Sequence, residues 1–381
     1  MTRELKMTVL APYANDHRDP NGPGDARPNA LKIVRDQNMD GKLTGKVFFI
    51  TGCTSGLGLE TARAIHATGA DIYFTGRDAQ KGEEIREALL RDGKPGKAEY
   101  VEMHLDSLDS VRAAATEFLR RSDKLNVLIC NAGQCQNIIP LLRRLFMSPL
   151  PSEHTNFHFT TGVRGYPKGK TKDGFELHFG INHLGHFTLF QALKDILIES
   201  STASFHSRVI SLSASGHRQS GIRFDDIHFE KNEEEYQPLL GYAQSKTANI
   251  LMAFEINRRY RSQGLHGLAV HPGGIMGTNL NRLTPSDQIT ALAAIPDVAI
   301  RLKSAEQGAA TTVWAAIAKE LEGKGERYLE DCQESELWDG NPAILAPGHA
   351  PHIHDQEAAS RLWEESLRMI SPDTKREANV S

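Results

Sequence analysis

A short apolar run, Lys46–Ile50, leads directly into a glycine-rich turn, Thr51–Gly58, and then into a helical pattern. The glycines of the turn, Gly52, Gly56 and Gly58, follow a G-x-x-x-G-x-G spacing. Glycines allow the backbone to turn tightly between a strand and a helix and to approach another group closely. The free N–H groups at the start of the helix suit an anion such as a pyrophosphate. The order strand, turn, helix therefore favours a nucleotide site, although the glycines alone leave open an ordinary turn without a ligand.

The turn begins a regular alternation of apolar strands and helices. Strands are expected at 46–50, 71–75, 98–104, 126–130, 208–212 and 265–270. Helices are expected at 60–66, 79–91, 110–120, 174–200, 242–263, 304–319 and 355–369. Continuous apolar strands separated by helices are typical of a parallel sheet that is covered on both faces. The pattern predicts a doubly wound α/β fold in one domain, residues 46–370, because no linker interrupts the strands.

Three segments lie outside this alternation. Residues 1–45 contain the run Asp19–Asp25, which is rich in turn formers, and we expect a flexible, disordered N-terminal arm. Residues 371–381 are expected to form a C-terminal tail. After the fourth strand, residues of about 134–166 have no clear period and predict an insertion. It can be a lid over a substrate site, an ordinary surface insertion or an error in the gene model, and the sequence does not decide between them.

Composition excludes several classes of protein. The 44 basic and 48 acidic residues give a net charge of −4, which does not suit binding to a nucleic-acid backbone. We find no apolar run of the roughly 18 residues that a membrane span needs. We expect no secretory signal, because the first 30 residues carry charges and prolines throughout and have no apolar stretch. Four cysteines do not make a disulfide framework. We expect no metal site, although three histidines lie close together near residue 350, and we expect a cytoplasmic protein that acts on a small molecule.

The end of the second strand bears on the choice of nucleotide. In dinucleotide-binding folds this position meets the adenosine ribose, where an acid binds the 2′-hydroxyl of NAD. Here Gly76 is followed by Arg77, with Lys81 four residues further on. A guanidinium can bind a 2′-phosphate through two hydrogen bonds, so we expect NADP(H), with NAD less favoured. The alternative is that Arg77 is only a solvated surface charge and that Asp78 binds the hydroxyl.

Tyr242 and Lys246 are four residues apart in a predicted helix, so both side chains lie on one face, about one turn apart. A free phenol has a pKa near 10 and is a poor acid–base group at neutral pH. A nearby cation favours the phenolate and moves that pKa towards the working range. The pair is suited to moving a proton to or from a carbonyl or alcohol oxygen. On its own the spacing is common by chance, and it gains meaning from the glycine turn.

Five motifs in this order make the chain resemble the short-chain dehydrogenase/reductase family, with its Rossmann-type fold. They are Thr51–Gly58, Asn131-Ala132-Gly133, Asn182-His183-Leu184-Gly185-His186, Tyr242–Lys246 and His271-Pro272-Gly273-Gly274. Within the family the chain is similar to the branch of retinol dehydrogenases and WW-domain oxidoreductases, including fungal relatives. The resemblance covers about residues 45–340. It implies a reversible transfer of hydride between NADP(H) and a carbonyl or alcohol on a hydrophobic small molecule, and it is compatible with a homodimer.

The resemblance also implies roles for individual residues. Tyr242 would donate or accept the proton, Lys246 would bind the nicotinamide ribose and acidify the phenol, and Asn182 would hold a water in a proton relay. The other cofactor contacts implied are Gly52, Ser55, Gly56, Leu57 and Gly58 near the pyrophosphate, Arg77 at the ribose, Asp106 at the adenine, Asn131 near the ribose, and Ile275 and Thr278 at the nicotinamide. For Asn131 and Asn182, a purely structural amide that ties loops together is the alternative.

One position departs from the family pattern. The family usually places a serine after the fifth strand to hydrogen-bond the substrate oxygen, and the alignment puts Ala214 there. Ser213 and Ser215 flank it, but neighbours in an extended strand point to opposite faces. Either Ser215 swings in, or the protein is a weakened or repurposed enzyme. The alternative function is therefore a non-redox scaffold, such as an isomerase, a cyclase or a regulatory binding protein.

Overall fold

The computed structural model describes residues 9–133, 168–231, 236–275, 290, 293–341, 343 and 345–371. The expected insertion at about 134–166, the expected contact Thr278 and nearly all of the expected tail 371–381 lie outside these residues.

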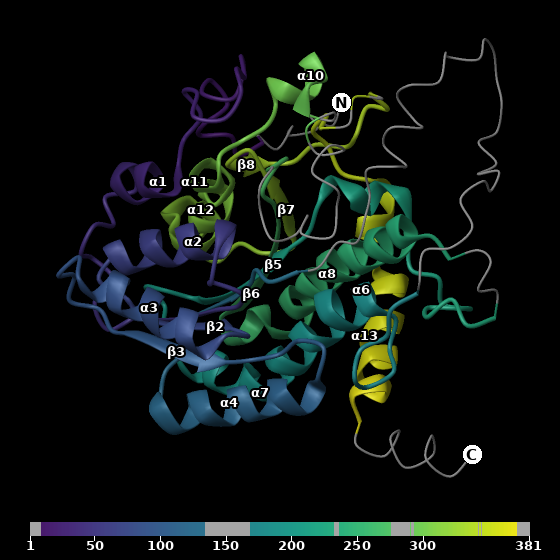
Figure 1. The fold of residues 1–381 in the computed structure, drawn as a ribbon, viewed down its shortest axis with the longest axis horizontal. Helices are drawn as coiled ribbons and strands as arrows, with labels where there is room; N and C mark the ends of the chain where they lie inside the picture. Colours follow the sequence, from purple (N-terminus) through teal and green to yellow (C-terminus); the bar gives the residue numbers. More distant parts are fainter. Residues whose placement is uncertain are drawn as a thin grey trace, which may run out of the picture.

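An eight-stranded sheet forms the centre of the molecule (Figure 1). Its strands are β1 (Val47–Ile50), β2 (Asp71–Gly76), β3 (Ala98–Glu102), β4 (Val127–Cys130), β5 (Ser207–Leu212), β6 (Leu265–His271), β7 (Arg327–Glu330) and β8 (Gln333–Glu334). The order is β3-β2-β1-β4-β5-β6-β7-β8, and every neighbouring pair is parallel except β7 and β8. This is the expected doubly wound Rossmann-type sheet.

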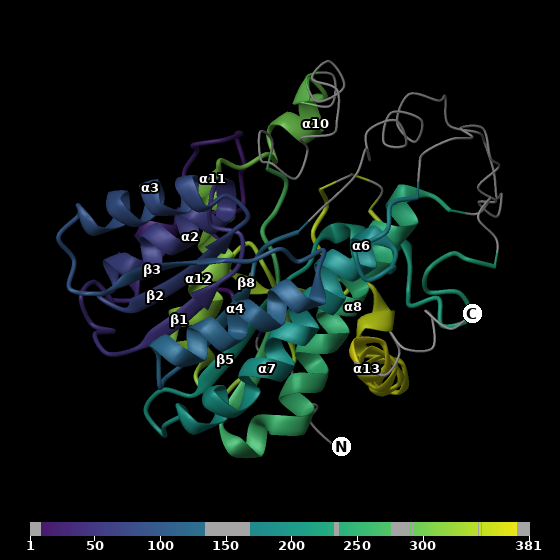
Figure 2. The same ribbon diagram turned by 60° about the horizontal axis from the view of Figure 1, so that its bottom comes forward.

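Helices cover both faces of the sheet (Figures 1 and 2). One face carries α1 (Ala30–Asp36), α2 (Gly56–Ala67), α3 (Ala79–Leu90), α11 (Ala305–Gly308) and α12 (Ala310–Ile317). The other face carries α4 (Leu108–Arg121), α7 (Gly185–Glu199) and α8 (Pro238–Tyr260), with α13 (Gln356–Ile370) packed against α8. Two further short helices are α6 (Leu177–Phe179), which precedes α7, and α10 (Pro296–Ala299), which precedes α11.

The residues of β1 show why the strands are apolar throughout. Phe48 and Ile50 point into the core beneath α2, whereas Val47 and Phe49 point into the core beneath α4. The ring of Phe49 meets that of Phe118 on α4 edge-on, at 5.2 Å between centroids. Because each face is buried against helices, alternation with polar residues is absent from this strand.

The first 45 residues correct the sequence-based expectation of a flexible arm. From residue 9 the chain is packed against the domain, and Tyr13, Ile33 and Val34 belong to the same apolar core as α2 and α12. Arg27 is buried and donates hydrogen bonds to the carbonyls of Arg301 (2.9 Å) and Leu302 (2.6 Å). The turn-forming residues of this segment therefore belong to a part of the chain that lies on the domain, where Arg27 finds its hydrogen-bond partners.

The strand order reverses direction between β1 and β4, whose carboxyl ends lie side by side. In open parallel sheets a crevice forms at this point, because the connections that follow the two strands leave towards opposite faces. The glycine turn follows β1 and Asn131 follows β4, so the fold brings these two motifs together at one edge.

Candidate active site

The glycine turn is compact because its backbone approaches itself closely. Gly52 has φ +72°, a conformation that residues with a Cβ rarely adopt. A Cβ on Gly58 would lie 2.2 Å from the Gly52 carbonyl oxygen and 2.6 Å from Asn131 Nδ2. Cys53 is buried, and burial raises the pKa of its thiol, so it is a packing residue and not a reactive one. The turn leads into α2, whose N-cap is Ser55, and the first residues of this helix line a cavity that is described below.

The end of β2 lies against this turn. Gly76 leaves room for Thr54, since a Cβ on Gly76 would be 2.3 Å from the Thr54 methyl group. The next residue, Arg77, is exposed, and in the described part of the chain its guanidinium takes part in no ion pair. Asp78 caps α3 by accepting a hydrogen bond from the Lys81 N–H (3.0 Å). The carboxylate is therefore engaged in its own helix, while Arg77 stands beside the glycine turn.

Two buried side-chain oxygens at this edge lack a hydrogen-bond partner among the described residues, Asp106 Oδ1 and Asn131 Oδ1. The Asn131 amide nitrogen is engaged, because it donates to the Thr51 carbonyl (2.8 Å) and the Gly52 carbonyl (3.3 Å). A buried acceptor without a donor costs free energy, so such atoms mark a place for a ligand or water. These positions fit a nucleotide that supplies amino and hydroxyl donors.

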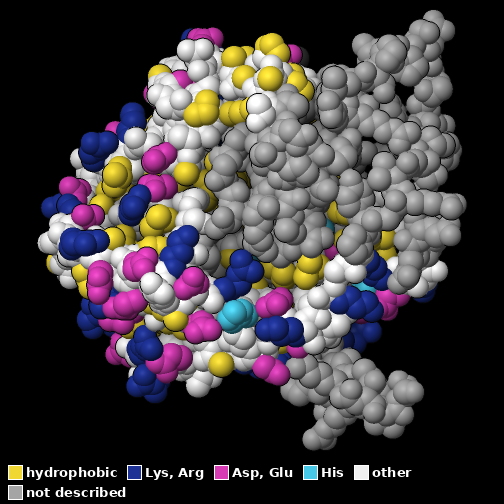
Figure 3. Space-filling view, viewed as in Figure 1, with side chains coloured by type: hydrophobic (Ala, Val, Ile, Leu, Met, Phe, Trp, Pro, Cys, Tyr) yellow, Lys and Arg dark blue, Asp and Glu magenta, His cyan; other side chains and the backbone are white. Residues whose placement is uncertain are grey.

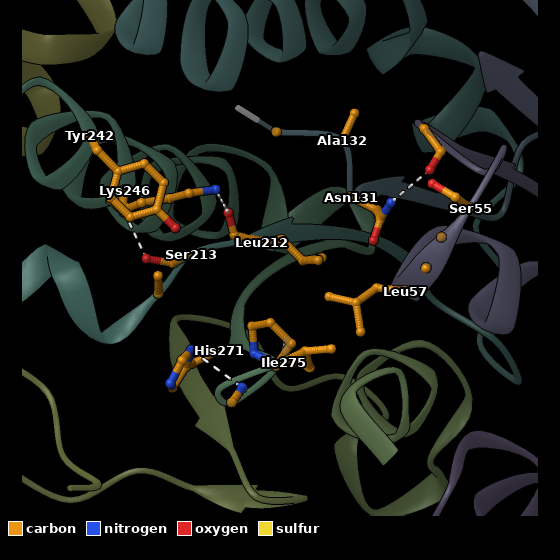
Figure 4. Close-up of a pocket in the computed structure, with 17 residues that line it drawn as sticks. Ser55, Leu57, Asn131, Ala132, Leu212, Ser213, Tyr242, Lys246, His271 and Ile275 are labelled. Carbon is orange, nitrogen blue, oxygen red and sulfur yellow. Dashed lines mark hydrogen bonds between the residues drawn. The ribbon is translucent and has the colours of Figure 1, made fainter. Parts of the chain in front are cut away.

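Tyr242 and Lys246 lie on α8 and point into the same cavity as the glycine turn (Figure 4). Both are buried, with 6% and 4% of their surfaces exposed. Lys246 Nζ lies 5.5 Å from the centre of the Tyr242 ring and donates a hydrogen bond to the Leu212 carbonyl (3.1 Å). The helix spacing therefore places the phenol and the ammonium together, and the end of β5 holds the ammonium in place.

Asn182 lies on a π-helical turn, Gly180–Leu184, between α6 and α7. Its side chain donates to Ser245 Oγ (3.0 Å), which in turn donates to the Tyr242 carbonyl (2.7 Å). Its own carbonyl meets His186 Nδ1 at 2.9 Å. π-helical turns inside helices are often found at functional sites. The structure brings Asn182 to the helix of the pair, behind the cavity wall.

The cavity between these elements has a volume of about 170 Å³. It is lined from the α2 side by Gly52, Ser55, Gly56, Leu57 and Gly58, from β4 by Asn131, Ala132 and Gly133, from β5 by Leu212, Ser213 and Ala214, from α8 by Tyr242 and Lys246, and from the end of β6 by His271, Pro272, Gly273 and Ile275 (Figure 4). Burial lowers the pKa of His271 to about 3, so its imidazole is neutral, and Nδ1 accepts a hydrogen bond from the Gly273 N–H (3.4 Å).

Comparisons with known proteins show which family the chain resembles. The family model for short chain dehydrogenase matches residues 46–213. A short-chain dehydrogenase/reductase of Penicillium roqueforti is 41% identical over 94% of this chain and 95% of its own. Mouse retinol dehydrogenase 12 is 33% identical over 86% of this chain and 87% of its own, and a WW domain-containing oxidoreductase of Pongo abelii is 32% identical over 91% and 72%. A solved structure of an uncharacterised protein from Mycobacterium paratuberculosis has a TM-score of 0.58 at 27% identity, over 87% of this chain and 97% of that one.

The chain belongs to the short-chain dehydrogenase/reductase family. The expected branch is also confirmed, since the matches include retinol dehydrogenases, WW domain-containing oxidoreductases and fungal members. The family is one of oxidoreductases that bind a nicotinamide cofactor, and the glycine turn and the two buried acceptors fit such a group.

The end of β5 holds Ala214, the residue predicted to stand at the position of the family's serine. Ala214 lines the cavity with an extended backbone (φ −159°, ψ 160°). Ser213 also reaches the cavity wall, but its hydroxyl donates to the Lys246 carbonyl (2.8 Å). Ser215 begins a 3-10 turn and does not belong to the described cavity lining. In this structure neither neighbouring serine therefore offers its hydroxyl at the place of Ala214.

Two contacts in this site are not indicated by the sequence. The acceptor for Lys246 is the backbone carbonyl of Leu212, which no residue type signals. The N-terminal segment, predicted to be an arm, reaches the far side of the loop that carries Gly273, where His17 and Arg27 line a second, smaller cavity together with Lys303 and Asp331. The helical spacing of Ala30, Ile33 and Val34 is a hint of this packing, but one short helix is a weak signal.

Neither a membrane-spanning helix nor a metal cluster occurs in the described part of the chain. Within it, no helix combines the length and apolar character needed to cross a bilayer. Likewise, the ranges that the structure describes contain no group of three or more potential metal-binding side chains. His349 and His354, which lie close together in the sequence, contact each other instead, with 3.1 Å between their Nε2 atoms.

The space-filling view shows that charged side chains of both signs are interspersed on one face of the molecule, over the helices of the β3 end of the sheet (Figure 3). No single-sign field is visible among the described residues of this face.

Proposed function

We propose that this protein is an NADP(H)-dependent oxidoreductase that interconverts a carbonyl and a primary or secondary alcohol on a hydrophobic small molecule. The observation that carries the proposal is that Tyr242 and Lys246 open into the same cavity as the glycine turn, on the opposite wall. A nucleotide bound along the turn and a substrate bound at the phenol would share this one space.

Each part of the chain has a defined task in this proposal. The bound dinucleotide would supply or accept the hydride. Tyr242 donates a proton to the substrate oxygen during reduction and accepts one during oxidation. Lys246, held by the Leu212 carbonyl, favours the phenolate through its charge. Asn182 and Ser245 hold the backbone of α8 beside Tyr242, in line with the proposed relay of protons from behind the pair.

The preference for NADP(H) over NAD(H) is supported by the end of β2. Arg77 is exposed beside the glycine turn, and the neighbouring carboxylate of Asp78 is engaged as a helix cap. The Arg77 guanidinium takes part in no ion pair among the described residues, and a guanidinium can bind a 2′-phosphate through two hydrogen bonds. Titration with NADPH and with NADH, followed by nucleotide fluorescence, tests this: we expect tighter binding of NADPH, and a loss of that preference in Arg77→Ala. Equal affinities in both proteins would contradict the proposed preference.

The substrate class is supported by the relatives and by the apolar part of the cavity. One relative is named a retinol dehydrogenase, and Leu57, Leu212 and Ile275 line the cavity here. The experiment is to follow NADPH consumption with a panel of apolar aldehydes and ketones, in wild type and Tyr242→Phe. We expect turnover by wild type and a loss of at least about 100-fold in the variant, since general acid–base groups contribute about that much or more. Equal turnover would remove Tyr242 from the chemistry.

A second candidate function is favoured by Ala214. Without a hydroxyl at this position the substrate oxygen loses a donor, so the protein is either a slow oxidoreductase or a scaffold that binds its ligands for another purpose, such as isomerisation, cyclisation or regulation. The two candidates differ in how they respond when Ala214→Ser restores the hydroxyl: only the slow oxidoreductase gains turnover.

A further inference from the structure

A buried carboxylate–imidazole pair lies next to α8, at the short helix α6. Glu176 is fully buried, and both of its carboxylate oxygens accept hydrogen bonds. Its Oε1 accepts from His178 Nδ1 (2.9 Å), from the His178 N–H (3.1 Å) and from the Tyr236 hydroxyl (3.1 Å), and its Oε2 accepts from the Phe179 N–H (2.8 Å). A carboxylate with this many donors is held in one orientation and in its charged form.

The pair approaches Tyr242 closely. The rings of His178 and Tyr242 meet edge to face, with 6.1 Å between their centres and an angle of 80°. Gly241, which precedes Tyr242, makes this approach possible: a Cβ there would lie 2.9 Å from Glu176 Oε1 and 3.3 Å from His178 Nδ1. The carboxylate therefore lies against the backbone one residue from the proposed proton donor, and the imidazole that it holds is in contact with the phenol ring.

The charges in this arrangement have opposite effects on the phenol. Burial acts to raise the pKa of Glu176, but the hydrogen bond and the charge of His178, together with backbone N–H groups, bring it below its usual value. An ionised carboxylate beside a phenol disfavours the phenolate, because both are negative. The imidazole of His178 pairs with the carboxylate and also contacts the Tyr242 ring, so it is placed to offset that effect.

We propose that His178 is a positioning residue that shields Tyr242 from the charge of Glu176 and so keeps the phenol acidic enough for proton transfer. This inference rests on the proposed function of Tyr242. It assigns to the Glu176–His178 pair a task beyond packing, since an apolar pair could fill the same space without supplying a charge.

Other titratable groups lie around Tyr242 and Glu176. Substitutions at Glu176 or His178 do not replace any of these groups, so all of them are present in every variant that is compared. Lys246 faces Tyr242 from its own helix, and Tyr328 on β7 lies near enough to interact with it electrostatically. On the far side of Glu176, His228 Nδ1 meets the Glu176 N–H at 3.3 Å, and burial lowers the pKa of His228. Beyond it lie Lys168, Lys170 and Glu230, which interact with His228.

The test compares His178→Gln, Glu176→Gln and the double variant. The acidity of Tyr242 is measured in the ligand-free protein by ultraviolet difference titration of the phenolate, with Tyr242→Phe as the reference that removes its signal. We expect His178→Gln to move the midpoint upward by about 1 pH unit, because the carboxylate is then no longer offset. Glu176→Gln and the double variant carry no buried carboxylate, so their midpoints should remain within about 0.5 unit of wild type.

A matched control is His183→Gln. His183 is also fully buried nearby, but its Nε2 contacts Ser366 Oγ (2.8 Å) on α13, away from the cavity. We expect this variant to lose stability without moving the Tyr242 midpoint. Thermal unfolding of every variant separates a loss of fold from a change in acidity.

Three outcomes would overturn the proposal. The first is an unchanged midpoint in folded His178→Gln, which would leave the pair a purely structural role. The second is an upward shift of similar size in Glu176→Gln, because that variant has no carboxylate to shield. The third applies if His178→Gln does not fold: an upward shift of about 1 unit or more in the neutral double variant would show that Glu176 is not the group being offset. Because the titration needs neither nucleotide nor turnover, its failure is distinguishable from a failure of the proposed function.

Discussion

At the residue scale, two features characterise the candidate site: the helical spacing of Tyr242 and Lys246, and Ala214 at the position where the family usually has a serine. The spacing of Tyr242 and Lys246 could be predicted from the sequence, because a helix places residues four apart on one face. The cavity lining around Ala214 could be predicted only by alignment. The contacts that hold Lys246 and Asn182 could not, because their partners are a backbone carbonyl and a serine hydroxyl brought close by the tertiary fold.

The substitution Ala214→Ser tests what the missing hydroxyl means. If the protein is a weakened oxidoreductase, a serine here adds a donor for the substrate oxygen, worth about 2.7–4 kcal/mol of transition-state stabilisation. We expect the rate of NADPH-dependent reduction to rise by about 10²–10³-fold, measured as kcat on a substrate found in the carbonyl panel.

Ser215→Ala is the matched control and should leave the rate unchanged, since Ser215 does not belong to the described cavity lining. Turnover that stays at background in Ala214→Ser, while NADPH still binds, would favour the non-redox scaffold.

At the element scale, the long strands and helices follow from their apolar patterns, whereas several small elements do not. The strands β7 and β8 contain few apolar side chains, so periodicity does not indicate them. The helix expected over 174–200 is divided into α6, the π-turn Gly180–Leu184 and α7, a change of hydrogen bonding that residue types do not signal. The short helix α1 is not predicted from the sequence, because the residues before it are rich in turn formers.

The N-terminal segment is expected to stabilise the loop at the candidate cofactor site. Arg27 is bonded to the carbonyls of Arg301 and Leu302, and the next residue, Lys303, donates its N–H to the Gly274 carbonyl (2.9 Å) beside Ile275. Breaking a buried charged network costs about 3–5 kcal/mol. We therefore expect Arg27→Ala to lower the free energy of unfolding by about 3 kcal/mol and to weaken NADPH binding.

Denaturant unfolding and NADPH titration measure both effects. Arg35→Ala is the control, because Arg35 is an exposed arginine of the same segment, and it should change neither. If Arg27→Ala matches wild type in both measurements, the segment has no such role.

At the scale of the whole molecule, the doubly wound sheet follows from the strand–helix alternation, and its crevice follows from the strand order. What could not be predicted is how many histidines the core contains. His183, His186, His217 and His271 are buried, and burial lowers the pKa of each, to about 3, 4, 3 and 3. Helical and strand periodicity does not indicate them, since histidine is found both inside and outside proteins.

These histidines predict loss of stability in acid. An unfolded histidine has a pKa near 6.5, so between about pH 6.5 and about pH 4 the unfolded chain binds more protons than the folded one. The free energy of unfolding therefore decreases as the pH is lowered through this range. Burial acts to raise the pKa of Asp331, but the charges of Lys303 and His17 bring it below its usual value. Protonation of Asp331 therefore also lowers the free energy of unfolding as the pH falls further. Burial raises the pKa of Glu330 to about 6, which acts in the opposite direction, but it is a single group.

We expect the midpoint of urea unfolding to be clearly lower at about pH 5 than at about pH 7, with each buried histidine contributing up to about 1.4 kcal/mol per pH unit. Measurements at constant ionic strength separate this effect from salt screening. A midpoint that is equal or higher in the more acidic buffer would mean that the histidines are not buried in the neutral form.

The central claim is that Tyr242 faces the reactive end of a dinucleotide held by the glycine turn. A crystal structure with NADP⁺ tests it most directly. We expect the pyrophosphate at Gly56–Gly58, the 2′-phosphate at Arg77 and the nicotinamide ring beside the Tyr242 hydroxyl. A nucleotide bound elsewhere, or a nicotinamide ring out of reach of that hydroxyl, would contradict the account.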